Sequence, residues 1–134
     1  MRQPNKLTES ILSTGIIDME PLKEWGHYLG TDGDNEGLKK ITSSQLRRFF
    51  GAVKKIQADF ENSKNEIVLL NPKLAYAVGR DYDKQKRRNK TKIKELYDLV
   101  NPLISAINED KNKFKNFVNV FESIVAYHKE KSGD

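Results

Sequence analysis

The sequence predicts an all-α protein that folds as a single compact bundle of about five helices, without a β-sheet. Apolar residues recur at the 3.6-residue period of an α-helix in several separate segments. No segment alternates apolar and polar residues in the way that indicates a half-buried strand. The length of 134 residues suits one hydrophobic core. We therefore expect residues 1–134 to form one helical domain.

The first expected helix follows an N-terminal segment, residues 1–17, that has little periodicity and is expected to be irregular. Asp18 is a suitable N-cap, and Pro21 fits the first turn. Apolar residues then repeat at helical spacing until Gly30, where the helix is expected to stop. A polar, glycine-rich loop at 31–37 should follow.

The clearest helix is expected at 42–62. Thr42 and Gln45 have the spacing of a capping box, in which side chain and backbone of both residues pair reciprocally. A second apolar pattern begins near Glu66. Pro72 lies within it, so the helix is expected either to kink or to start there, and Gly79 is a plausible end.

The last two helices are expected on either side of a turn at 108–110. Before them, residues 80–92 form a basic connecting segment. Apolar periodicity resumes at Ile93 and continues to Ile107. It starts again at Phe114, on a helix that carries His128 on its apolar side.

The sequence offers little for catalysis or metal binding. It has no cysteine, and its two histidines have no partner at metal-ligand spacing. Residues 32–37 resemble the start of a calcium loop, but Ser43 stands where the bidentate Glu of such a loop is needed. No catalytic signature motif is present. We expect a protein that is not an enzyme and needs no cofactor and no metal.

Charge is unevenly distributed along the chain. The formal net charge is +5, yet residues 1–42 hold five basic and seven acidic side chains, and residues 43–134 hold 19 and 12. Such asymmetry suggests a polyanionic partner. No apolar run approaches the roughly 20 residues of a membrane span, and the polar start lacks a signal-peptide core. We expect a cytoplasmic protein without membrane contact.

A basic stripe is expected on the helix at 42–62. At about 100° per residue, its apolar side chains lie on one side, and four cations lie on the other. These cations are Arg47, Arg48, Lys54 and Lys55, with Gly51 between them. The stripe is either a phosphate-binding surface, with Gly51 allowing close approach of a backbone, or an ordinary solvated face with a tolerated glycine.

A second basic cluster lies at 80–94, with eight basic and two acidic residues. It is either a nucleic-acid contact or a solvated linker. Lys90, Lys92 and Lys94 would stand at a helix N-terminus, where cations oppose the macrodipole. That placement favours a binding role, and Tyr82 offers a ring for stacking.

Three stretches resemble one known family. They are residues 41–47 (ITSSQLR), 71–80 (NPKLAYAVGR) and 117–129 (FVNVFESIVAYHK). In order and spacing they are similar to blocks of the small helical subunit of the type III-A CRISPR–Cas (Csm) interference complex. The resemblance covers about residues 41–130, and residues 1–40 match no block.

The resemblance implies a non-catalytic, RNA-binding scaffold subunit. Such subunits stack in copies along the duplex of guide (CRISPR) RNA and target RNA, and contact mainly its sugar-phosphate backbone. The implied partners are both RNAs, the backbone and large subunits of the complex, and further copies of the chain. Base pairing reads the sequence, so the protein needs only complementary shape and charge.

The residues expected to contact RNA are Arg47, Arg48, Lys54, Lys55, Lys73, Arg80, Arg87, Arg88, His128 and Lys129. Most lie inside the three blocks or extend the first. Arg87 and Arg88 lie between blocks and depend on charge alone. His128 is alternatively a core-edge histidine, and Tyr76 lies inside the second block, where an aromatic ring can be core.

Two other functions remain open from the sequence. A helical interaction module would stack on its neighbours with little RNA contact. A sequence-specific DNA-binding domain is a third option, but helix-turn-helix proteins have a short turn between two helices, and the 80–94 stretch is too long for that.

Overall fold

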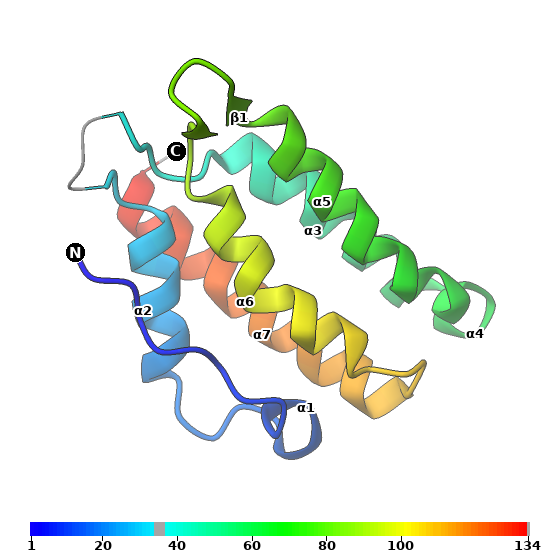
Figure 1. The fold of residues 1–134 in the computed structure, drawn as a ribbon. Coiled ribbons are helices and arrows are strands. Elements are labelled where there is room, and N and C mark those ends of the chain that lie inside the picture. The colour runs from blue at the N-terminus through cyan, green and yellow to red at the C-terminus, as the bar shows by residue number, and fades with distance from the viewer. Residues whose placement is uncertain (34–36, 134) are drawn as a thin grey trace.

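The structure is a computed structural model that describes residues 1–33 and 37–133. Five helices of ten or more residues make up the body of this part of the chain (Figure 1). They are α2 (Glu20–Leu29), α3 (Ser43–Ala58), α5 (Leu70–Arg80), α6 (Ile93–Ser105) and α7 (Lys111–Ser132). The prediction of an all-α fold with about five helices is confirmed.

Shorter elements connect these helices. They are α1 (Ile11–Thr14), α4 (Phe60–Ser63), the 3₁₀ helix η1 (Lys64–Leu69) and the strands β1 (Tyr82–Asp83) and β2 (Arg88–Asn89). The two strands pair antiparallel, with Tyr82 opposite Asn89, so the expected absence of any sheet is wrong for this hairpin. Helix α1 falls within the N-terminal segment expected to be irregular, and it buries Leu12 in the core.

Local sequence signals set most helix ends. The capping box of α3 is present as predicted, since the Gln45 amide N–H donates to Thr42 Oγ1 at 3.1 Å and the Thr42 N–H donates to Gln45 Oε1 at 2.9 Å. At α7, the Asp110 carboxylate accepts from the Lys113 N–H at 2.9 Å. The prediction of Asp18 as an N-cap is wrong, because the N-cap of α2 is Met19. The Asp18 carboxylate still accepts from the Glu20 N–H at 3.0 Å.

Two expectations for the middle of the chain are decided by α5. Pro72 lies in its first turn, where a proline needs no N–H donor, so the helix starts there and is not kinked. Gly79 does not end the helix, which continues through it to Arg80. The expected acidic loop at 31–37, with its partial calcium-loop pattern, includes residues 34–36, which lie outside the described residues.

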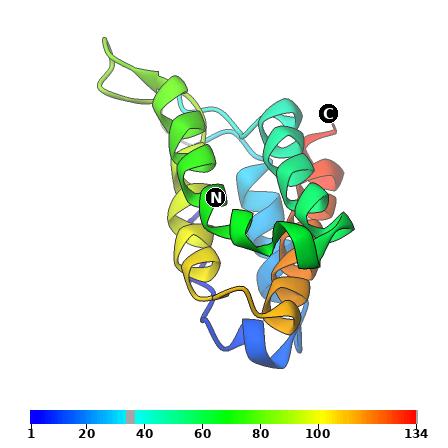
Figure 2. The ribbon, with the colours of Figure 1, turned by 90° about the vertical axis from the view of Figure 1, so that its right-hand side faces the viewer.

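The core is one continuous apolar cluster that draws on every long helix. Helix α7 packs against α1, α2 and α3, while α5 packs against α3 and α6. Phe121 of α7 meets Phe49 and Phe50 of α3 at ring-centroid distances of 5.2 and 5.8 Å. Figure 2 shows the β1–β2 hairpin projecting beyond the helix ends, next to the end of α5. The fold thus leaves α3, α5 and the hairpin with outward faces on which cations can gather.

Candidate nucleic-acid interface

The basic stripe of α3 lies on the surface. Arg47, Arg48, Lys54 and Lys55 are all exposed, and the opposite side of the helix is buried in the core. Lys54 Nζ lies 3.7 Å from Glu122 Oε2, and both side chains are about half exposed. An exposed pair of this kind is weak, so Lys54 stays able to meet another anion.

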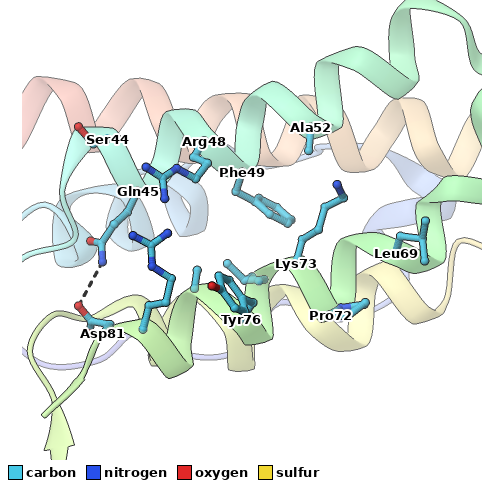
Figure 3. Close-up of a pocket in the computed structure, with 13 residues that line it drawn as sticks. Ser44, Gln45, Arg48, Phe49, Ala52, Leu69, Pro72, Lys73, Tyr76 and Asp81 are labelled. Atoms are coloured by element: carbon cyan, nitrogen blue, oxygen red, sulfur yellow. Dashed lines mark hydrogen bonds between the residues drawn. The ribbon is translucent and has the colours of Figure 1, made fainter.

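A groove runs between α3 and α5 (Figure 3) and encloses about 770 Å³. Arg48 reaches it from α3, and Lys73 and Arg80 reach it from α5. Three predicted site residues therefore line one groove: Arg48, which directly follows the first sequence block, and Lys73 and Arg80 of the second. Arg47, Lys54 and Lys55 do not line the groove and present their charge on the neighbouring surface of α3.

The groove has a buried apolar floor and a solvent-exposed rim. Phe49 and Leu74 are almost fully buried at its floor, whereas the ring of Tyr76 is 70% exposed. The Arg80 guanidinium carbon lies 5.8 Å from the centroid of that ring. Tyr76 belongs to the second sequence block, and the reading of its ring as core does not hold.

Asp81 closes one end of the groove and anchors the hairpin. Its Oδ1 accepts from Gln45 Nε2 at 3.2 Å, the bond drawn in Figure 3. Its Oδ2 accepts from the Thr91 N–H at 2.9 Å, from Thr91 Oγ1 at 3.1 Å and from Asn89 Nδ2 at 3.3 Å. A buried carboxylate needs such partners. These hydrogen bonds therefore fix both ends of the hairpin to each other and to α3, within the segment 80–92 that the sequence predicts to be a basic connection.

Beyond this anchor, the hairpin carries an exposed group of cations: Lys84, Lys86, Arg87 and Lys90. Asp83 shapes the turn, because its Oδ1 accepts from the N–H groups of Lys86 and Gln85. The bond from Lys86, and then that from Gln85, keeps the pKa of Asp83 below its usual value. Arg87 adopts a left-handed conformation, with φ of 57°, and Arg88 is partly exposed.

Lys92 is buried, unlike most of the basic cluster at 80–94. The side chain is 1% exposed. Its Nζ donates to the Tyr28 carbonyl at 2.8 Å and lies 3.7 Å from the centroid of the Tyr28 ring. Lys94, the second residue of α6, pairs with Asp98 at 2.7 Å. The poor placement of Lys92 at a helix N-terminus is thus compensated inside the protein, and its interpretation as a binding residue is wrong.

His128 also lies in the core. It is 1% exposed, and its Nε2 donates to the Ile41 carbonyl at 2.7 Å. Burial conflicts with the expected RNA contact and agrees with the alternative of a core histidine. Lys129, the next residue, is exposed on α7 but does not line the groove.

Within residues 1–33 and 37–133, no three His, Cys, Asp or Glu side chains gather in a way that could hold a metal ion. In the same part of the chain, no helix is both long and apolar enough to cross a membrane.

Comparisons with known proteins place the chain in a family. Neither the curated proteins nor the solved structures contain a match. The model of one protein family, described as Csm2 Type III-A, matches residues 19–134. This range includes all three blocks noted in the sequence and extends the similarity to α2. The chain therefore belongs to the Csm2 family and is a small Csm subunit of type III-A CRISPR–Cas.

Proposed function

We propose that this Csm subunit is a non-catalytic RNA-binding scaffold, which stacks in copies along the duplex of guide and target RNA and contacts its backbone. Its partners are the two RNAs, the backbone and large subunits, and other copies of itself. The observation that carries the proposal is the convergence of Arg48, Lys73 and Arg80 on the α3–α5 groove. The remaining site residues add charge on α3, the hairpin and α7, with His128 left out because it is buried.

The distribution of acids supports this function. The carboxylate that reaches the groove belongs to Asp81, whose oxygens already accept four hydrogen bonds from the protein. Glu122 pairs with Lys54, which does not line the groove. Within the part of the chain that the structure describes, Arg48, Lys73 and Arg80 form no ion pair with an acid. Exposed cations of this kind can replace the counterions of a phosphate backbone, and such binding is independent of base sequence.

A matched pair of triple variants tests the proposal. The first changes Arg48, Lys73 and Arg80 to Ala. The control changes Lys111, Lys113 and Lys115 at the start of α7, which removes the same charge without touching the groove. We expect the groove variant to bind an RNA duplex more weakly, with a logarithmic salt slope lower by about 2 to 3, because each phosphate contact contributes about 0.9.

The control variant should lose little affinity and keep its salt slope. A duplex affinity that does not change with salt, or an equal loss in both variants, would contradict the proposal. Urea denaturation of both variants shows whether either substitution set unfolds the chain.

One observation favours the alternative, a helical interaction module with little direct RNA contact. Val68 and Leu69, at the end of η1, are 66% and 47% exposed. Contiguous exposed apolar patches commonly mark contacts between proteins, and these two neighbouring side chains would form part of such a patch. Leu69 lines the groove and Val68 does not, so Val68→Ser is the variant to test. If Val68→Ser reduces self-association or complex assembly while RNA affinity stays the same, protein contact is the main role of this end of the molecule.

A further inference from the structure

The α3–α5 groove has the dimensions of a ligand site. Its volume of about 770 Å³ lies within the roughly 300–1,000 Å³ usual for pockets that hold small molecules. Phe49 and Leu74 provide an apolar floor, and Ala52 of α3 lies across from Leu69, the last residue of η1, and Pro72 of α5 (Figure 3). A helical backbone rich in phosphates would touch only the rim of such a groove and leave its apolar interior unused.

Tyr76 gives the groove a surface suited to a planar ring. The ring is 70% exposed, although burial of an aromatic side chain is favourable. Lys73, Tyr76 and Arg80 lie on one face of α5, because residues three, four and seven apart share a helix face. The guanidinium carbon of Arg80 lies over this ring, 5.8 Å from its centroid, in a cation–π contact.

Cations flank this ring on both walls. Lys73 and Arg80 lie one turn before and one turn after Tyr76, and Arg48 faces them from α3. A strand of RNA alternates anionic phosphates with flat bases, and the sequence of cation, ring and cation along α5 matches that alternation. An acidic helix of another protein would instead need an unbroken apolar strip, which Lys73 interrupts as it extends between the walls (Figure 3).

We infer that the groove binds one unstacked nucleotide of single-stranded RNA, with its base against Tyr76 and its phosphates at Arg48, Lys73 and Arg80. The inference rests on the proposed function for the class of ligand. It goes beyond it because the contact is with a base and not with the backbone of a duplex. Stacking on an aromatic ring tolerates any base, so this site adds affinity for single strands without reading sequence.

Two substitutions of Tyr76 in the full chain separate stacking from packing. Tyr76→Phe keeps the ring, and Tyr76→Leu keeps apolar bulk without a ring. The probes are a short unstructured RNA oligonucleotide and an RNA duplex of the same length. We expect Tyr76→Leu to weaken single-strand binding by about tenfold, the scale of one lost stacking contact, and Tyr76→Phe to bind like the parent chain. Both should bind the duplex unchanged.

Fluorescence gives a second readout. Trp25 is 1% exposed, so Tyr76→Trp introduces an indole that is accessible to the ligand, while the native one is not. Single-stranded RNA should quench the added emission at concentrations that match its affinity.

The outcomes distinguish the inference from the function on which it rests. If Tyr76→Leu binds single strands like the parent while duplex binding stays sensitive to salt, the inference fails and the proposed function stands. If neither RNA binds, both fail. Binding of an acidic helical peptide that Tyr76→Leu abolishes, with RNA binding unaffected, would also overturn the inference, because the groove would then be a protein-docking site.

Discussion

Two helical glycines, one inside the molecule and one on its surface, have opposite surroundings. Gly26 lies where α2 meets α7, and a Cβ placed there would stand 2.5 Å from Tyr127 Cβ and 2.8 Å from the Ile124 carbonyl oxygen. Gly51 lies among the cations of α3, and a Cβ placed there would meet nothing within 4 Å. Close packing of two helices thus explains why residue 26 is a glycine, whereas the packing around residue 51 does not require one.

This difference helps to locate function. Glycine within a helix costs about 1 kcal/mol relative to alanine. At Gly26 that cost is offset because the backbones of α2 and α7 can approach closely. At Gly51 no atom of the described residues comes close enough to explain the absence of a Cβ. A partner that approaches the basic face of α3 closely, as the proposed RNA backbone would, can explain why residue 51 is a glycine.

The largest effect is expected at the inner glycine. Gly26→Ala should lower the free energy of unfolding by about 3 kcal/mol, since the added methyl group would overlap backbone and Cβ atoms that have little room to move. Urea denaturation measures this change, and Gly51→Ala is the matched control on the open surface. An unfolding free energy for Gly26→Ala equal to that of the parent would mean that α2 and α7 can separate without cost.

Two lysines extend the comparison to charge. Lys92→Ala should lower the free energy of unfolding by about 2 kcal/mol, because it removes a charged hydrogen bond to the Tyr28 carbonyl in the core. Lys90→Ala, two residues earlier, changes an exposed side chain, and we expect a change below about 0.5 kcal/mol. Equal stability of the two variants, measured by urea denaturation, would show that burial of Lys92 adds nothing to the fold.

The sequence predicts what depends on neighbours along the chain. The capping box at Thr42 and the apolar faces of the long helices follow from spacing, and the structure agrees with them. The basic face of α3 also follows from spacing. Its exposure is confirmed, whereas its contact with RNA stays a prediction.

The spacing of residues along the sequence does not reveal contacts between distant segments. Lys92 bonds to a carbonyl 64 residues away, and His128 to one 87 residues away. Nothing in a charge count separates Lys92 from the exposed Lys90. The hairpin was missed for a similar reason, since Asp81 holds it through Thr91 and Gln45, and strands of two residues carry too few side chains to show alternation.

The smallest expected effect is the most specific to function. Gly51→Ala should raise the free energy of unfolding by about 1 kcal/mol, because helix propensity improves and no atom is displaced. If an RNA backbone lies against this face, the same methyl group should weaken duplex binding by about fivefold, equivalent to about 1 kcal/mol. Most substitutions that stabilise a protein do not change its binding affinity. A variant that is more stable but binds the duplex more weakly would therefore be hard to explain without a partner close to residue 51. A more stable variant that binds the duplex as the parent does would instead mark Gly51 as a tolerated glycine on a solvated face, and RNA contact would then depend on the groove and the hairpin.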